Sequence, residues 1–206
     1  MSPVRTKSPL QAEKILDAAA GLFASQRFHE ARMEDIAAAA EVGKGTIYRY
    51  FKDKEELYVA LLERAAAGIS ARLAQETAAA RGVHERLQAV VRAILGYFDE
   101  NPHLFDLIQH AEAMSPPQAL QSWHRWREEV TGRVREIFEE ARQCAAFTID
   151  DPQLVALLFL GSLRSIIRFG PRPRPGDLPR QIIDVFLHGA AVPAKTGRRI
   201  PQPSRD

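Results

Sequence analysis

The sequence predicts an all-α protein of about nine helices, organised as a short N-terminal tri-helical unit followed by a larger helical bundle. Apolar residues recur at spacings of three and four along nearly every segment, with alanine, leucine, glutamate and arginine between them. Helix-start signals, in which a capping residue precedes a proline or an acidic turn, divide the chain into segments. With 46% hydrophobic and 26% charged residues, the 206-residue chain has an ordinary globular composition.

Composition also indicates the cellular compartment in which the protein is expected. Cys144 is the single cysteine, so no internal disulfide forms, and the N-terminus lacks the apolar core of a signal peptide. The longest strongly apolar run, Leu154 to Leu163, stops at Arg164, well short of a membrane span. We therefore expect a cytoplasmic protein with no membrane segment. The net charge is only +2, and residues 1–54 hold that excess, with nine Lys/Arg against seven Asp/Glu.

Three short helices are expected near the N-terminus. The first begins at Pro9, because Ser8 is an N-cap residue and proline suits the first helical position. The second covers residues 33–40 and the third covers residues 44–51. Each has an apolar stripe at helical spacing: Ile15, Ala18, Ala19, Leu22 and Phe23, then Met33, Ile36, Ala37 and Ala40, then Ile47 and Phe51.

Six mostly longer helices are expected to follow and to form an antiparallel bundle. Asp53, Asn101 and Asp151 are N-cap residues at three of their starts, while Gly82 and Gly170 are expected stops. The expected ranges are 54–80, 83–100, 102–114, 116–147, 152–169 and 178–191.

The segment from Gly43 to Phe51, GKGTIYRYF, has an unusual outer surface for a short helix. Ile47 and Phe51 share a face and are expected to pack inward, because a helix this short needs tertiary anchors. The rest of its surface then carries cations and tyrosines. The alternative is that Tyr48 and Tyr50 are half-buried packing residues and that the charged residues merely solvate a surface.

The connection before this segment has the length used in helix-turn-helix units. Only Glu41, Val42 and Gly43 separate it from the preceding helix. The second helix of such a unit lies in the DNA major groove, where small residues permit close approach and cations, hydroxyls and polar-tipped rings meet phosphates and bases. The residues that supply these groups are Lys44, Gly45, Thr46, Tyr48, Arg49 and Tyr50, with Lys54 near the start of the next helix as a phosphate contact.

Residues 10–58 closely resemble the N-terminal domain of TetR/AcrR-type transcriptional regulators. The resemblance is carried by ILDAA (15–19), LF (22–23), MEDIA (33–37), VGKGTIYRYF (42–51) and KEEL (54–57). It implies an all-helical homodimer whose two helix-turn-helix domains bind half-sites of a palindromic operator in double-stranded DNA, usually as a repressor released by a small-molecule ligand. It also implies recognition-helix contacts from Lys44, Gly45, Thr46, Tyr48, Arg49 and Tyr50, and a phosphate contact from Lys54.

Four positions depart from the family pattern. Glu41 stands where a turn glycine is usual, at a cost on the order of 1 kcal/mol for a left-handed residue. Gly43 replaces the usual capping serine or threonine at a cost of about a few tenths of a kcal/mol. Tyr50 stands where histidine is common. Arg32 stands where a hydroxyl residue often caps the second helix and touches phosphate, and its charge still suits a phosphate contact.

The resemblance implies a ligand-binding and dimerisation domain, placed here at residues 55–192, after a DNA-binding domain at residues 1–54 and before a disordered tail at residues 193–206. Aromatic and aliphatic residues crowd its middle helices, as in an apolar small-molecule site with one or two polar groups. The candidate ligand-binding residues are Phe98, Phe105, His110, Met114, Trp126 and Arg164. The alternative for each is ordinary packing, and no ligand is identified.

The helices expected at 152–169 and 178–191 are apolar almost all round, so they must be covered on nearly every side. In the family resembled, the last two long helices commonly form a four-helix interface between two copies. The candidate interface residues are Leu158, Leu163, Ile167, Ile183, Phe186 and Leu187. The alternative is ordinary core within one chain.

No cofactor, metal or enzymatic chemistry is predicted. His103 and His110 are too far apart in sequence for the usual helical metal pair, and no phosphate loop or nucleophile motif occurs in the sequence. Two rivals stay open: a helical small-molecule carrier or enzyme whose tri-helical unit makes only protein contacts, and a DNA-binding activator without ligand control. Salt-dependent duplex binding separates the first rival, and ligand titration of an operator complex separates the second.

Overall fold

Helices form the regular structure throughout the part of the chain that the computed structural model describes, namely residues 8–26, 28, 30–113, 121–143 and 150–188. Within these residues there are nine α-helices and no strand, so the predicted all-α fold is confirmed. The helices are α1 (Pro9–Ser25), α2 (Met33–Ala39), α3 (Lys44–Tyr50), α4 (Lys54–Thr77), α5 (Gly82–Glu100), α6 (Pro102–Ala113), α7 (Gln121–Gln143), α8 (Pro152–Phe169) and α9 (Leu178–His188). The start predicted at residue 116 and the tail predicted at residues 193–206 lie outside the described residues.

Two of the predicted helix starts are held by side-chain caps. Asp53 caps α4 by accepting a hydrogen bond from the Glu56 N–H at 2.8 Å, and the Glu56 carboxylate accepts one from the Lys52 N–H at 2.6 Å. Asp151 caps α8 by accepting hydrogen bonds from two backbone N–H groups of the first turn. The sequence therefore fixes where both helices begin.

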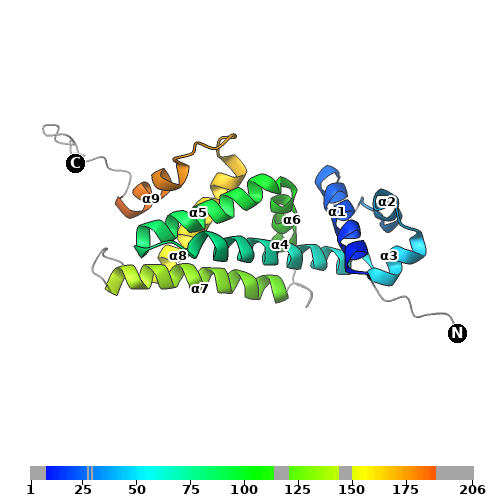
Figure 1. Ribbon diagram of the computed structural model, residues 1–206, viewed down its shortest axis with the longest axis horizontal. Helices are drawn as coiled ribbons and strands as arrows, with labels where there is room; N and C mark the ends of the chain where they lie inside the picture. Colours follow the sequence, from blue (N-terminus) through cyan, green and yellow to red (C-terminus); the bar gives the residue numbers. More distant parts are fainter. Residues whose placement is uncertain (1–7, 27, 29, 114–120, 144–149, 189–206) are drawn as a thin grey trace, which may run out of the picture.

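The molecule has two parts, which we call the headpiece (α1–α3) and the bundle (α4–α9). Figure 1 shows the headpiece at one end, with α4 running from it along the bundle. The predicted boundary at residues 54 and 55 falls in the first turn of α4. Aromatic rings join the parts, because Tyr58 of α4 packs against Phe28 and Phe23, with ring centroids 4.8 and 6.0 Å away. Helix α4 is thus both a member of the bundle and a support for the headpiece.

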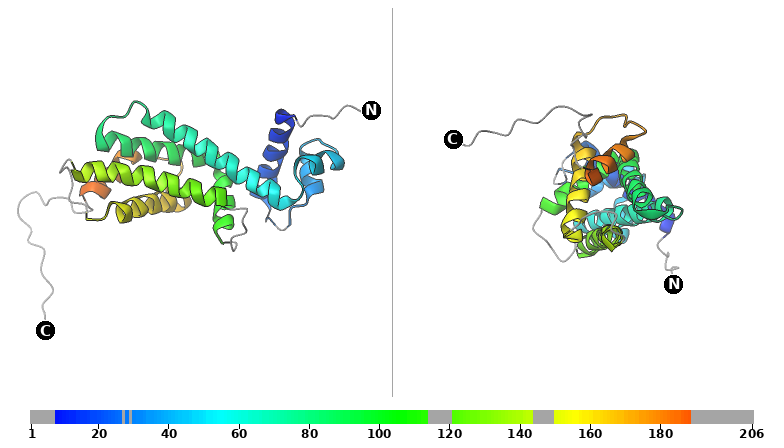
Figure 2. Two further views of the ribbon diagram at one scale, coloured as in Figure 1. Left: turned by 90° about the horizontal axis from the view of Figure 1, so that it is seen from below. Right: turned by 90° about the vertical axis from the view of Figure 1, so that its left-hand side faces the viewer.

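The bundle is assembled around α4, α5, α7 and α8, with α9 packed against α5 (Figure 2). Helices α4 and α5 approach closely at Gly68, where an added Cβ would lie 2.6 Å from the Tyr97 hydroxyl. At the other end of the bundle Phe138, Phe159 and Phe186 pack together from three helices, with centroid separations of 5.2 to 5.9 Å. The core therefore runs the length of the bundle.

Candidate DNA-binding surface and effector cavity

Helix α3 is held on the headpiece by three aromatic or aliphatic side chains. Ile47 is fully buried, and Tyr50 and Phe51 are each 7% exposed. Seven residues are too few for a stable isolated helix, so these contacts hold α3 in place. The prediction that Ile47 and Phe51 pack inward is confirmed.

The opposite flank of α3 faces solvent. Lys44, Gly45, Tyr48 and Arg49 are exposed and Thr46 is half-buried. Tyr48 keeps 41% of its surface, although large aromatic residues usually bury more. The flank lies at the end of the molecule away from α7 to α9 (Figure 1), so the bundle does not cover it.

One of these cations is already paired within the headpiece. Lys44 Nζ lies 2.7 Å from Glu34 Oε1 of α2, and both side chains are largely exposed. The hydrogen bond between them raises the pKa of the Lys44 ammonium and lowers the pKa of the Glu34 carboxyl. A phosphate contact from Lys44 therefore exchanges one anionic partner for another.

Tyr50 has a different role from the one expected of it. Its ring is buried, and its hydroxyl accepts a hydrogen bond from the Ser8 backbone N–H at 2.7 Å. The guanidinium carbon of Arg49 lies 5.4 Å from the ring centroid. The structure thus corrects the prediction that Tyr50 faces DNA, because the i,i+3 relation to Ile47 turns its ring to the core and ties α3 to the start of α1.

Lys54 also points inward. Its ammonium donates hydrogen bonds to the carbonyl oxygens of Phe28 at 2.7 Å and Ala31 at 3.0 Å. It also lies 4.5 Å from the Phe28 ring centroid, within range of a cation–π contact. The α1–α2 connection leaves these carbonyls without helical donors, so Lys54 satisfies them. This corrects its predicted role as a phosphate contact: the residue clamps α4 to the headpiece.

The turn before α3 contains two of the positions that depart from the family pattern, Glu41 and Gly43. Glu41 is left-handed, with φ of 55°, as expected for a position usually occupied by glycine. Gly43 is the N-cap of α3 and makes no side-chain cap, and nothing lies within 4 Å of a Cβ added there. Arg32 occupies the N-cap position of α2 but its side chain does not cap the helix. The side chain is exposed at the start of α2, the first helix of the helix-turn-helix unit.

Helix α4 makes two sets of polar contacts, one within the bundle and one with the headpiece. The Tyr58 hydroxyl of α4 donates a hydrogen bond to the Leu107 carbonyl of α6 at 2.5 Å. Arg64 of α4 forms ion pairs with Glu13 and Asp17 of α1, at 3.1 and 2.7 Å. Helix α4 is therefore bonded both to α6 and to α1.

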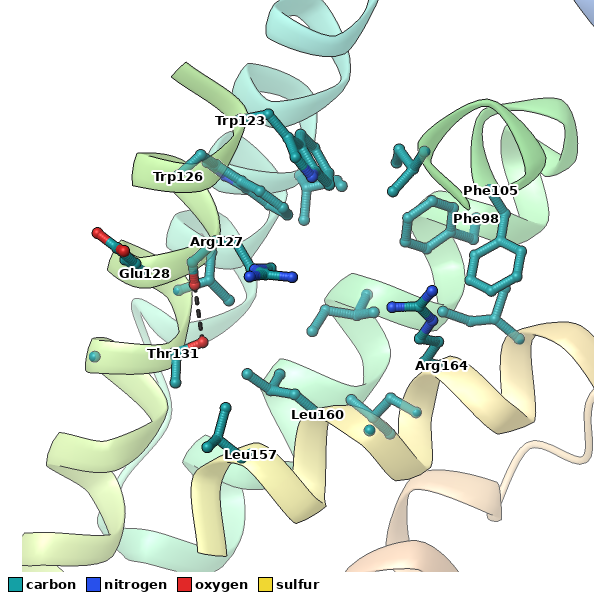
Figure 3. Close-up of a pocket in the computed structure, with 18 of the residues that line it drawn as sticks. Phe98, Phe105, Trp123, Trp126, Arg127, Glu128, Thr131, Leu157, Leu160 and Arg164 are labelled. Carbon is teal, nitrogen blue, oxygen red and sulfur yellow. Dashed lines mark hydrogen bonds between the residues drawn. The ribbon is translucent and has the colours of Figure 1, made fainter. Parts of the chain in front are cut away.

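A cavity of about 620 Å³ opens between the helices of the bundle (Figure 3). Its size lies within the range of roughly 300–1,000 Å³ typical of small-molecule sites. The floor is apolar and buried, whereas the polar side chains of the rim lie on α7 and at Gln153 and Arg164 of α8, where they are exposed. The floor includes Ile69, Ile94, Phe98, Phe105, Ile108 and Leu163.

Four of the six predicted ligand-binding residues line this cavity, namely Phe98, Phe105, Trp126 and Arg164. Met114 and the side chain of His110 lie outside the described residues. Arg164 reaches the cavity from α8, and its guanidinium donates a hydrogen bond to the Gln109 side-chain oxygen. The sequence therefore identified part of the lining, whereas ligand contact by these residues is still a prediction.

The prediction missed the polar side of the cavity on α7. Arg127, Thr131 and Arg135 follow one another at i,i+4 spacing and all line it, one turn after Trp123, an aromatic residue of the middle helices. That spacing is visible in the sequence, but the partner face of α7 is not. Trp126 stacks on Trp123 at 4.5 Å and donates a hydrogen bond to the Ser70 hydroxyl of α4 at 2.8 Å.

The Trp123 indole is an unusual member of this lining. The side chain is 5% exposed, and its Nε1–H is buried without a hydrogen-bond partner among the described residues. A buried donor without an acceptor costs about 1–3 kcal/mol. The cavity wall therefore contains a donor that an entering acceptor would satisfy.

The outer face of α8 is apolar and exposed. Leu154, Leu157 and Leu158 are 52%, 51% and 58% exposed, and Val185 of α9 is 57% exposed. Exposed large apolar side chains are typical of surfaces that pack against a partner. The stripe continues along α8 through Gly161, whose added Cβ would meet nothing within 4 Å.

The structure corrects half of the predicted interface residues. Leu163, Ile167 and Ile183 are at most 4% exposed and belong to the core of one chain. Phe186 and Leu187 are half-buried, and Phe186 packs against Phe138 and Phe159. Of the six, Leu158 is the one that faces fully outward. The reason is that α5 and α7 cover one side of α8, and that α9 packs against α5.

Among the described helices, α8 is long and apolar enough to cross a membrane by length and composition alone, although 22% of it is buried within the protein. The same composition suits a helix covered by neighbours on one face and by a partner on the other. The described residues contain no cluster of three or more potential metal ligands.

These features define a helical regulator with a terminal helix-turn-helix and a separate cavity-bearing bundle, and comparison with known families agrees. The family model "Bacterial regulatory proteins, tetR family" matches residues 15–61, and "Tetracyclin repressor-like, C-terminal domain" matches residues 80–189. The chain belongs to the TetR family. It is a TetR-family transcriptional regulator with a DNA-binding helix-turn-helix domain.

Curated relatives are regulators of several kinds. The transcriptional activator FasR of Mycolicibacterium smegmatis is 30% identical over 105 residues, 51% of this chain and 48% of FasR. The nucleoid occlusion factor SlmA of Photobacterium profundum is 27% identical over 181 residues, 83% of this chain and 91% of SlmA. The match thus spans about half of FasR but most of SlmA.

Solved structures share the fold at low sequence identity. The fatty acid degradation regulator FadR of Bacillus halodurans has a TM-score of 0.77 and 21% identity, covering 90% of this chain and 98% of that chain. FadR of Bacillus subtilis, solved in complex with stearoyl-CoA, has a TM-score of 0.75 and 20% identity, covering 87% and 99%. These likenesses establish the fold.

Proposed function

We propose that this protein is a homodimeric repressor that binds a palindromic operator through the two α3 helices and is released by a small molecule bound in the bundle cavity. The observation that carries the proposal is the outward flank of α3, where Lys44, Tyr48 and Arg49 are exposed while Ile47 holds the helix from behind. Cations and polar-tipped rings on a helix of this kind suit phosphates and base edges. The proposed contacts are Arg32, Lys44, Gly45, Thr46, Tyr48 and Arg49.

Dimerisation is supported by the exposed leucines of α8 and by Val185 of α9. A second copy placed on this face would bury them in an isologous interface. Two headpieces would then meet successive major grooves, roughly 34 Å apart along the duplex. A two-fold protein reads a palindromic site.

Release by a ligand is supported by the contacts between the cavity and the headpiece. Phe105 and Ile108 line the cavity on either side of Leu107, whose carbonyl accepts the Tyr58 hydrogen bond. On α4, Ile69 lines the cavity. A ligand that shifts α6 or α4 therefore changes the headpiece position and the spacing of the two α3 helices.

The test begins with selection of bound sequences from random duplex DNA, followed by size measurement of the free protein and its complex. We expect a palindromic site, a dimer, and binding that weakens as salt rises. Leu158→Asp should give a folded monomer with weak operator binding. Recovery of no enriched site, or salt-independent binding, would favour the carrier or enzyme rival.

The direction of regulation is a separate question, because FasR is named an activator. A reporter gene placed behind the selected site distinguishes the two signs. We expect lower reporter output when the protein is present and recovery when the effector is added. Increased output that ignores every cavity ligand would support the ligand-independent activator.

A further inference from the structure

We infer that the effector is a long-chain acyl compound with an anionic head group, held in the cavity by Arg127 of α7 and Arg164 of α8. This inference rests on the proposed function, in that it names the class of molecule that the cavity takes. It is carried by three features of the lining: facing cations, a deep apolar floor and a buried indole donor.

The cations converge on one space. Figure 3 shows the guanidinium groups of Arg127 and Arg164 projecting into the cavity from opposite helices, while the Glu128 carboxylate points away from it. Arg135 adds a third positive charge to the lining, against Glu128 as the single acid among the lining residues. An anion placed between the two guanidinium groups would be attracted by both. Arginine suits carboxylate and phosphate equally, because its donors form a planar fork.

The floor beyond the arginines suits a hydrocarbon chain. Phe98, Phe105 and Ile108 close it on the α5 and α6 side, and they are buried. No acidic side chain belongs to this lining apart from Glu128. Each methylene buried there should tighten binding by about fourfold.

The Trp123 indole supplies a third point of recognition. Its Nε1–H is buried and without a partner among the described residues, and it stands one turn before Arg127 on the same face of α7. An acyl group has a carbonyl oxygen close to its head, and a carbonyl is the acceptor that such a donor needs. An acyl compound therefore matches the cations, the indole and the floor together.

The experiment uses the full-length protein without DNA. Intrinsic fluorescence is a suitable probe because Trp123 and Trp126 are the two tryptophans of the chain and both line the cavity. Their fluorescence and calorimetry report the binding of laurate, lauroyl-CoA, methyl laurate and coenzyme A alone. We expect at least one of the two anionic acyl ligands to bind about tenfold or more tightly than both methyl laurate and coenzyme A. Tight laurate binding identifies a carboxylate as the anion, and tight binding of lauroyl-CoA alone identifies its phosphates. Methyl laurate or coenzyme A binding as tightly as the best acyl anion overturns the inference.

Variants locate the head group. Arg127→Met and Arg164→Met should each weaken binding of the anionic ligand by about tenfold to a hundredfold and leave methyl laurate within about threefold. Arg125→Met is the matched control, since it removes the same charge from an exposed position of α7 outside the lining. Trp123→Phe, measured by calorimetry, should weaken acyl binding by about twofold to tenfold. Equal effects of Arg125→Met and the two cavity variants would contradict the assignment.

The outcome is separable from the proposed function. If an acyl anion binds the free protein through these arginines but leaves the operator complex intact, the ligand class stands and release fails. If a neutral ligand dissociates the operator complex while acyl anions do not bind, release stands and the ligand class fails.

Discussion

The headpiece and the bundle both bury apolar side chains spaced at three and four residues, but they differ in how many faces of a helix those side chains occupy. In α3, Ile47, Tyr50 and Phe51 lie on one side, so the polar flank has to lie outside. In α8, apolar residues occupy every side, and the positions of α5 and α7 decide that Leu163 is core and Leu158 is surface. When apolar residues occupy one side of a helix, the sequence alone shows which side faces solvent. When they occupy every side, the exposed side is known only from the positions of the neighbouring helices.

The largest effect on stability is expected from Ile47→Asp in the headpiece, which tests the contrast between the two parts. The substitution removes a fully buried anchor and places an unpaired carboxylate in the core, so we expect a cost above about 4 kcal/mol. Urea unfolding followed by circular dichroism should show a headpiece transition that is lost, together with operator binding. Ligand fluorescence from the bundle should persist. Loss of ligand binding as well would show that the two parts are not separable.

The second test separates two residues of α8 and α9 that the sequence treats alike. Ile183 is fully buried, so Ile183→Ala should lower the free energy of unfolding by about 2–5 kcal/mol in urea titrations. Leu158→Ala changes an exposed residue and should leave monomer stability within about 0.5 kcal/mol while weakening dimerisation. The reverse order of the two effects would mean that the faces of α8 and α9 have been assigned wrongly.

The third test compares the two tyrosines of α3. Tyr50→Phe removes the hydroxyl that accepts from Ser8, so stability should fall by about 0.5–1.5 kcal/mol with little change in sequence preference. Tyr48→Phe should leave stability unchanged and weaken operator binding. Thermal unfolding and duplex titration of both variants give the answer. A fall in operator affinity confined to Tyr50→Phe would restore Tyr50 as a DNA contact.

The smallest effect is expected at the turn. Glu41→Gly relieves a left-handed residue at a gain of about 1 kcal/mol or more but loosens the unfolded chain, so the net stabilisation should be about 0.5 kcal/mol. Differential scanning calorimetry measures it against Glu41→Ala, which keeps the strain. A larger stabilisation from alanine than from glycine would contradict the reading of this turn.

The sequence predicts the nine helices and the inward face of α3 because caps and one-sided periodicity are local signals. It does not predict that the side chains of Tyr50 and Lys54 point inward, because their hydrogen-bond partners are distant in the sequence. The Tyr50 hydroxyl accepts from the Ser8 N–H, and Lys54 donates to the carbonyls of Phe28 and Ala31. The α7 side of the cavity was missed for the same reason. From the sequence alone, Arg127 and Arg135 are indistinguishable from ordinary solvent-exposed charges. Only the position of α8 opposite α7 shows that they line a cavity.

The interface predictions show where periodicity stops being informative. Leu163 and Ile167 lie on the same apolar helix as Leu158, and nothing local to the sequence distinguishes them. Burial by α5 and α7 does. The family resemblance pointed to α8 and α9 for the proposed dimer face, but three of the six residues chosen on them are buried within one chain.

The most direct measurement of the central claim is the affinity of the full-length protein for its selected duplex across a salt series, for wild type and for the double variant Tyr48→Ala/Arg49→Ala. Arg81→Ala, which removes an exposed cation at the α4–α5 turn, is the matched control. We expect the double variant to fold normally, to bind at least about a hundredfold more weakly and to lose about 2 from the salt slope of the dimer, one arginine per protomer. The control should bind like wild type. A folded double variant with wild-type affinity and salt slope would contradict the account, because the outward flank of α3 would then not be the surface that binds DNA.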